Sequence, residues 1–483
     1  MKKIMWILGL ILICTACTPP KSIPIPDDVV KLAEDAQRNH QTIEKQPILI
    51  ESYRENNHLD DYFTSFDYLL NHNKKSSPVS TFSYQQAKED IESLFLLFRN
   101  LYGNYETFGG DTRFKEAKEA ILSELSSYEK LTYEDFSYIV RKNLSFIEDS
   151  HVQIDFSILQ DIVLLYTSID TLDITKQGNV YYHEGKKIQA IQDDKDVAAY
   201  VKPTLQEGKE TYRLYIQSDL PPRELLITYE DGTQDRIAMK VITPDYDEDA
   251  TYHREELQSI PYIAVTRMAF PEVNYSSKKE AEKFLESAED FKESPVAILD
   301  LRGNTGGNLF LAEQWAKAFT NETIQGNIIS LLKLPLEDKR FHQGIQWSQD
   351  PEEILSFTMY KKLNDLYYIT NNNRKERKMM DNDTILFVLQ DANTASAAEH
   401  LMDYLHNVTN VIFVGTPTRG MLKGSSMATV YLEQTSLQVS LGNMRNSIST
   451  QYGKEYYGIH PDLWVEGDAL EEVLKLFPKE YGR

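Results

Sequence analysis

The sequence is poor in cysteine, and its two cysteines, Cys14 and Cys17, both lie in the first 17 residues. The rest of the chain therefore has no disulfide and no thiol nucleophile. It also lacks the paired ligand spacings of metal sites, such as two CxxC motifs or HExxH. We therefore predict neither a metal nor an organic cofactor.

Positive charge is scarce as well. The chain has 51 Lys and Arg residues against 74 Asp and Glu residues, which gives a formal net charge of -23. This excludes a nucleic-acid partner, because phosphate contacts need clustered Lys and Arg. Hydrophobic residues make up 41% of the 483 residues, enough for two or three domains with a sizeable core.

The N-terminus has the pattern of an export signal. Two lysines precede an apolar run at 4–13, which is too short to span a membrane as a permanent helix. Two small residues then lead to Cys17, and the stretch resembles a bacterial lipoprotein signal, although Cys14 stands where Leu is usual. The resemblance implies lipidation of Cys17 and anchoring to a membrane on the extracytoplasmic side of the cell envelope. Ordinary secretion with cleavage nearby is the alternative.

Composition and periodicity divide the rest of the chain into four segments. After a signal peptide at 1–16, we predict a lipid-anchor linker and N-terminal extension at 17–81, a helical domain at 82–156, a β-rich domain at 157–245 and a catalytic α/β domain at 255–478. In the helical domain, Ser83 and Gln86 form a capping-box pattern, and apolar residues recur at three- and four-residue steps.

Two of these segments leave alternatives open. The stretch at 185–197 is faintly similar to the second half of a PDZ domain, and a generic β-rich insert explains it equally well. One short helix is expected there, near 196–201. In the α/β domain, strand and helix patterns alternate. A polar insert at 335–380 interrupts them, and it is either an active-site flap or a surface excursion.

The stretch at 296–308 is the centre of the α/β domain. Its first six residues are almost all apolar, which predicts a strand buried on both faces. Gly306 and Gly307 follow, and a helix is predicted at 309–319, so their N–H groups would favour an anion. The anion would be an oxyanion or a phosphate, and a tight turn without chemistry is the alternative. A phosphate is disfavoured because no P-loop Lys or Ser/Thr follows.

A second buried strand, predicted at 384–389, leads to Ser396. This serine lies among small residues where a helix begins, so its hydroxyl would be exposed with the Ala397 N–H beside it. A serine nucleophile needs this arrangement, and a simple helix N-cap is the alternative. Its base would be one of three histidines: His400 on the same helix, His460 or the distant His151.

Taken together, four separated stretches resemble the S41 serine peptidases, which include the C-terminal processing proteases and the tricorn core protease. They are 149–151 (DSH), 300–307 (DLRGNTGG), 394–399 (TASAAE) and 455–462 (EYYGIHPD). Their order and approximate spacing also fit, and the resemblance spans about 82–155 and 260–465. It implies a crotonase/ClpP-like fold for the catalytic domain.

This family has two catalytic styles. In the processing proteases the serine works with a lysine directly after a glycine, but here Met421 holds that place and Lys423 comes two residues later. The tricorn-like branch uses a serine, a histidine, a serine before that histidine, and a glutamate near the C-terminus. The matching positions are Ser396, His151, Ser150 and Glu455.

The resemblance to this branch implies a role for each matching residue. Ser396 would be the nucleophile and His151 the general base, while Glu455 would orient or polarise the base through Ser150. Histidine suits this task, since its ordinary pKa of about 6.5 allows proton transfer near neutrality. The oxyanion donors would be the amide of Ala397 and that of Gly306 or Gly307.

We therefore predict an exported, membrane-anchored serine endopeptidase whose substrates are peptides or unfolded proteins. One alternative is a catalytically silent lipoprotein that binds peptides on the same fold. The other is a Ser–Lys peptidase that uses Lys423. The sequence predicts no oligomeric state.

Overall fold

The structure is a computed structural model. It describes residues 24–50, 53, 59–75, 77–243, 252–268, 275–335, 337–340, 360–370, 378–425 and 428–478. The predicted signal peptide, Cys17 and most of the insert at 335–380 lie outside these ranges. Within them, no helix has both the length and the apolar composition needed to cross a membrane.

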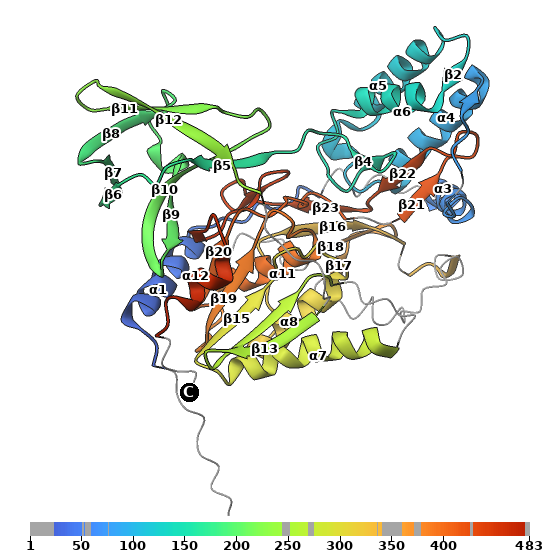
Figure 1. Ribbon diagram of the computed structural model, residues 1–483. Helices are drawn as coiled ribbons and strands as arrows, with labels where there is room; N and C mark the ends of the chain where they lie inside the picture. Colours follow the sequence, from blue (N-terminus) through green and yellow to red (C-terminus); the bar gives the residue numbers. More distant parts are fainter. Residues whose placement is uncertain are drawn as a thin grey trace, which may run out of the picture.

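A large twisted sheet forms the centre of the catalytic domain, below the other parts in Figure 1. Five of its strands are parallel neighbours, in the order β14–β15–β19–β20–β26, and β13 lies antiparallel at the edge. The bounds are β13 (Tyr252–Leu257), β14 (Ile260–Val265), β15 (Val296–Asp300), β19 (Ile385–Gln390), β20 (Val411–Gly415) and β26 (Leu463–Trp464). Both predicted buried strands are present, because β15 and β19 are buried at every position.

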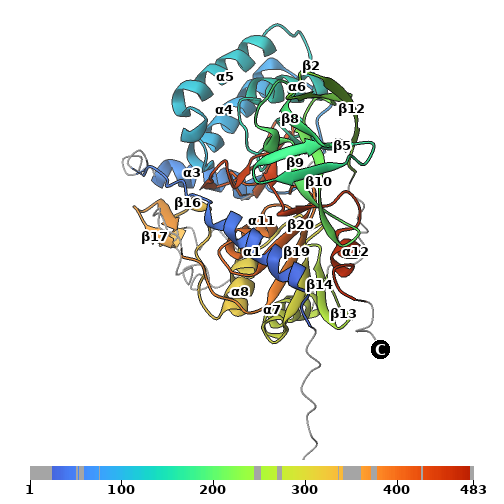
Figure 2. The same cartoon turned by 90° about the vertical axis from the view of Figure 1, so that its left-hand side faces the viewer.

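Helices cover both faces of this sheet. One face carries α7 (Tyr275–Lys292), α8 (Leu309–Thr320) and α11 (Ala397–Leu405), and their apolar residues share a core with alternate positions of β15 and β19. The opposite face carries α1 (Asp27–Gln41) and α12 (Ala469–Leu474), as Figure 2 shows for α1. The layered α/β arrangement follows from this burial on two sides.

The β-rich strands continue the same sheet. Trp464 of β26 pairs in parallel with Thr204 of β9, which extends the sheet to 14 strands. The further strands are β9 (Val201–Gln206), β10 (Lys209–Ser218), β5 (Leu164–Ser168), β12 (Gln234–Val241), β11 (Glu224–Tyr229), β8 (Lys186–Ile191), β7 (Val180–His183) and β6 (Ile174–Gln177). In the region where a short helix was expected, near 196–201, the structure has a 3-10 helix at Val197–Ala199.

The predicted helical domain contains three helices, α4 (Tyr84–Leu101), α5 (Gly110–Leu125) and α6 (Tyr133–Leu144), and α3 (Leu59–Asn71) packs against α4. The predicted capping box is formed, since Gln86 N–H donates to Ser83 Oγ and Ser83 N–H donates to Gln86 Oε1. Figure 1 shows these helices together at the upper right.

Two small sheets join the helical domain to the catalytic domain, and one hydrophobic core contains residues of both. One sheet contains β17 (Tyr360–Lys362), β18 (Tyr367–Thr370), β16 (Ile329–Lys333) and β23 (Met444–Ser447). The other contains β21 (Ala428–Tyr431), β22 (Gln438–Leu441), β3 (Gln153–Ile154) and β4 (Ser157–Ile158). This second sheet holds the His151 segment against the catalytic domain.

The strand after His151 is short. It ends at Ile154, and the next two residues, Asp155 and Phe156, turn with positive φ. Phe156 is 61% exposed. The mixed α/β class is as predicted, while the crotonase-like and PDZ-like assignments stay predictions.

Candidate active site

Ser396 lies between β19 and α11, immediately before the first residue of the helix. Its φ of 54° and ψ of −114° are outside the regions that non-glycine residues ordinarily adopt, so the position is strained. The preceding loop is fixed by Asp391, whose Oδ1 accepts from the N–H groups of Gly303 and Thr394 at 2.9 and 3.0 Å. Strain at a well-anchored turn is typical of a functional position.

The double glycine lies directly against this serine. A Cβ on Gly306 would come within 2.8 Å of Ser396 Cβ and 3.0 Å of Ala397 N, so only glycine fits there. The Gly306 N–H donates to Asn304 Oδ1 at 2.9 Å and is already used. Among the described contacts, the Gly307 amide has no acceptor, and Ala397 is the first residue of α11, where helix amides lack internal acceptors. Of the two predicted glycine donors, Gly307 is therefore the better placed.

His151 and Ser396 meet although 245 positions separate them in the sequence. The His151 Nε2 atom lies 3.3 Å from Ser396 Oγ, which is within reach for proton transfer. His151 follows α6, and its position is set by a turn in which Val152 N–H donates to Asp149 O. Its side chain is only 3% exposed.

The other ring nitrogen of His151 faces Asp149, a residue to which the sequence analysis gave no role. Asp149 is fully buried, and its Oδ1 accepts from the His151 N–H at 3.0 Å and lies 3.5 Å from His151 Nδ1. Its Oδ2 accepts from Tyr102 O–H at 2.8 Å and Asn104 Nδ2 at 3.0 Å. The only sequence signal was its place two residues before His151, since Tyr102 and Asn104 come from a distant segment.

Glu455 binds the main chain on either side of the site. It lies in the turn between β24 (Gly453–Lys454) and β25 (Gly458–Ile459). Its Oε1 accepts from Ser150 N–H at 2.8 Å and Ser150 Oγ at 2.6 Å. Its Oε2 accepts from the N–H groups of Leu422 and Lys423 at 2.8 and 2.7 Å. Glu455 thus fixes the residue next to His151 to a loop of the catalytic domain.

These groups form one buried electrostatic unit. Burial alone would lower the pKa of His151, but the carboxylate of Asp149, with Glu455 beyond it, raises the pKa above the usual value. Burial alone would raise the pKa of Asp149, but hydrogen bonds and the charge of His151 hold it below the usual value. Burial and the charge of Asp149 raise the pKa of Glu455. Asp149 therefore stabilises the positive charge that His151 gains when it accepts a proton.

A second buried carboxylate that the sequence analysis missed lies beneath Ser396. Glu399 is fully buried on α11, and its Oε2 accepts from Ser396 N–H at 2.7 Å and Met421 N–H at 3.0 Å. Its Oε1 accepts from Thr418 Oγ1 and from Gly420 N–H. Burial raises its pKa to about 7 despite these donors. Glu399 therefore ties the nucleophile turn to the loop at 418–421.

The other candidate bases do not reach Ser396. The His400 Nε2 lies 3.4 Å from Asn446 Nδ2, and burial lowers the pKa of His400 to about 4. The His460 Nε2 lies 2.9 Å from Gln217 Oε1 of β10. The Lys423 Nζ is paired with Glu148 at 3.1 Å.

Comparison with known proteins places this site in a family. Residues 259–465 match the family model of peptidase family S41. The match covers somewhat less than half of the chain, and it identifies this segment as similar to the S41 peptidases. It supports serine-type peptidase activity, as the four sequence stretches predicted. No curated protein sequence matches the chain.

Solved structures with related folds include other proteases. Mature CPAF is 12% identical over 81% of this chain and 95% of its own, with a TM-score of 0.42. The photosystem II D1 C-terminal processing protease is 15% identical over 81% of this chain and 97% of its own, with a TM-score of 0.36. A lipoprotein from Streptococcus agalactiae is 14% identical over 84% and 98%, with a TM-score of 0.38.

Proposed function

We propose that the protein is an exported, membrane-anchored serine endopeptidase in which Ser396 is the nucleophile and His151 the general base. The 3.3 Å contact between His151 Nε2 and Ser396 Oγ carries this proposal. It brings a base nitrogen to the hydroxyl that must lose its proton, beside the strained turn and the amides of Ala397 and Gly307.

The reaction follows from these positions. Ser396 Oγ attacks the peptide carbonyl carbon while His151 Nε2 takes the hydroxyl proton, and the amides of Ala397 and Gly307 would hold the oxyanion. His151 then gives the proton to the amide nitrogen, the C–N bond breaks and the amine leaves. In the second half, His151 takes a proton from water, which attacks the acyl ester. The acid leaves, and Ser396 regains its proton.

Two carboxylates support His151 by different routes. Asp149 faces Nδ1 directly at 3.5 Å, so its charge would stabilise the imidazolium that forms during attack. Glu455 binds the main chain and hydroxyl of Ser150 and so holds the adjacent His151 in place. We propose Asp149 as a positioning residue for the base, alongside the role predicted for Glu455 through Ser150.

The contacts of Lys423 favour the histidine over a Ser–Lys pair. Its side chain is 27% exposed and its ammonium is paired with Glu148. A lysine base has to lose its proton near neutral pH, which requires burial away from carboxylates. Lys423 meets neither condition, since its side chain is partly exposed and its ammonium contacts a carboxylate.

The membrane anchor is proposed from the sequence of the first 17 residues. The apolar run and Cys17 match a lipoprotein signal, and the acidic, cysteine-free body suits life outside the cytosol. The first described helix, α1, packs on the catalytic domain and begins at Asp27. A short segment would therefore separate the lipid from the folded body.

Labelling by a serine-directed organophosphonate tests the nucleophile. The wild-type protein should be labelled at Ser396, and Ser396→Ala should lose both labelling and peptide hydrolysis while its circular dichroism stays unchanged. Ser93→Ala is the matched control, because this serine lies on α4 and its hydroxyl donates to Glu89 O. Labelling that survives Ser396→Ala would move the chemistry to another residue.

A further inference from the structure

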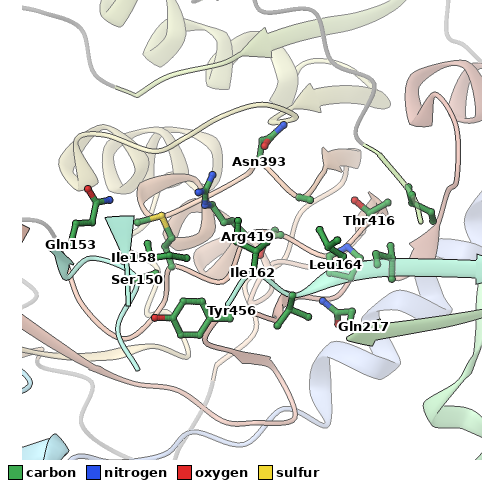
Figure 3. A pocket seen from close by; sticks show the side chains of 17 residues that line it. Ser150, Gln153, Ile158, Ile162, Leu164, Gln217, Asn393, Thr416, Arg419 and Tyr456 are labelled. Atoms are coloured by element: carbon green, nitrogen blue, oxygen red, sulfur yellow. The ribbon is translucent and has the colours of Figure 1, made fainter. Parts of the chain in front are cut away.

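A cavity of about 460 Å³ lies beside the candidate catalytic residues. Its walls come from the catalytic domain, the segment after His151, and strands β5, β10 and β12 with their flanking residues (Figure 3). Apolar side chains predominate in the lining, with a few polar groups among them. This size and composition are typical of ligand sites in proteins.

The inner wall of the cavity is continuous with the nucleophile turn. Ser150, which donates two hydrogen bonds to Glu455 Oε1, directly precedes His151 and lines the cavity. Asn393 lies three residues before Ser396 and also lines it. Met421 lines it as well, and its N–H shares the Glu399 Oε2 acceptor with the Ser396 N–H. A chain bound across Ser396 would therefore pass this cavity.

The outer wall presents apolar side chains to solvent. Ile162 and Leu164, at the start of β5, line the cavity and are 63% and 43% exposed. In Figure 3, these two residues and Ile158 lie between Asn393 on one side and Tyr456 on the other. Exposed apolar side chains around a hollow indicate a surface that is covered when something binds.

Among the described residues, Arg419 is the one charged side chain that lines the cavity. It is exposed at the cavity wall, and no acidic residue of the described chain lines the cavity with it. The Arg419 main chain is fixed, because its N–H donates to Thr394 O at 2.9 Å. A basic side chain entering the cavity would therefore meet the like charge of Arg419, with no carboxylate among the described lining residues to pair with.

We propose that this cavity is a substrate subsite that takes an apolar side chain of an extended polypeptide near the scissile bond and rejects a basic one. The inference rests on the proposed function, because it needs Ser396 to be the nucleophile. The occupant is the substrate because the inner wall is shared with the nucleophile turn. Ile158, Ile162, Leu164 and Met421 contact its apolar side chain, and Arg419 sets the charge preference.

The test uses the full-length protein and a peptide library varied at each position around the scissile bond, with cleavage products identified by mass spectrometry. We expect one fixed position at which Leu, Ile or Phe is preferred over Ala by about tenfold in kcat/KM, with Lys and Arg disfavoured. Ile162→Ser should remove most of the apolar preference, and Arg419→Gln should relax the discrimination against Lys. Ile169→Ser is the matched control, since Ile169 is 52% exposed but lies outside the cavity lining.

The organophosphonate labelling rate of Ser396 separates the two proposals. Normal labelling with no positional preference, or with a preference that Ile162→Ser leaves intact, would overturn the subsite alone. If the wild-type protein were neither labelled at Ser396 nor able to cleave any peptide, both the proposed function and the subsite would be overturned. A dimer in sedimentation that Ile162→Ser dissociates would assign the apolar wall to a second copy and would also overturn the subsite.

Discussion

The Nδ1 atom of His151 lies 3.5 Å from Oδ1 of Asp149, on the opposite side of the imidazole from Ser396. Asp149 is fully buried, and Tyr102 and Asn104 donate to its second oxygen. The carboxylate is therefore held in one orientation beside the base. A buried carboxylate in that place stabilises a positively charged imidazole and opposes rotation of the ring.

Asp149→Asn tests this relationship. Because Asp149 raises the pKa of His151, removing its charge should lower that pKa and move the acidic limb of the kcat/KM profile to lower pH. The rate at neutral pH should also fall, on the order of 10²- to 10⁴-fold, because the base loses its supporting charge. Glu148→Gln is the control, since this carboxylate pairs with Lys423. An unshifted acidic limb in Asp149→Asn would show that Asp149 is only structural.

Gly306→Ala should damage the site through contact with the nucleophile. The new Cβ would lie 2.8 Å from both Ala395 O and Ser396 Cβ, at a φ of +91° that disfavours alanine. We expect kcat to fall by about 10²-fold or more, because displacement of reacting groups by about 1 Å has this effect.

Gly232→Ala is the matched control for that variant. Gly232 has a similar φ of +82°, but nothing lies within 4 Å of its added Cβ. It should lose about 1–2 kcal/mol of unfolding free energy, because of its left-handed backbone, and keep its activity. Equal kinetic losses in the two variants would show that backbone strain, rather than contact with Ser396, is responsible.

Glu399 should make stability depend on pH. Its folded pKa of about 7 lies above the value of an unfolded glutamate, so the folded state binds a proton more tightly between about pH 4.5 and 7. The contribution of Glu399 to the free energy of unfolding should therefore fall as pH rises through that range and stay constant above it. Glu399→Gln has no titrating group there, so its melting temperature relative to wild type should rise with pH. A pH-independent difference in melting temperature would contradict this assignment.

Cys17→Ala tests the membrane anchor. A lipidated wild-type protein should enter the detergent phase on phase separation, and the variant should stay in the aqueous phase. Stable anchoring takes two hydrophobic chains, which a diacylated cysteine supplies. Cys14→Ala is the control, because it lies within the predicted signal peptide. Equal partitioning of wild type and Cys17→Ala would exclude the lipid anchor.

Local patterns predicted the helices and buried strands well. The periodic apolar residues of α4 to α6, the capping box at Ser83 and the buried run at 296–300 each depend on neighbours close in sequence. The pairing of Trp464 with Thr204 does not depend on sequence neighbours. It joins two parallel strands that lie about 260 positions apart in the sequence. No local pattern could therefore show that the β-rich strands extend the catalytic sheet.

The site was predictable only in part for the same reason. Family resemblance pointed to Ser396, His151 and Glu455, whereas residue spacing alone favoured none of the histidines. Asp149 and Glu399 were missed because their importance comes from buried contacts. Asp149 depends on Tyr102 and Asn104, and Glu399 depends on donors in the loop at 418–421.

Comparing His151→Ala with Lys423→Ala tests the central claim most directly. His151 lies 3.3 Å from the Ser396 hydroxyl, while Lys423 is paired with Glu148. We predict that His151→Ala lowers kcat on the order of 10⁴-fold or more, with Ser396 labelling slowed in parallel, and that Lys423→Ala costs roughly tenfold at most. The reverse order, with Lys423 essential and His151 dispensable, would contradict the account and assign the protein to the Ser–Lys branch.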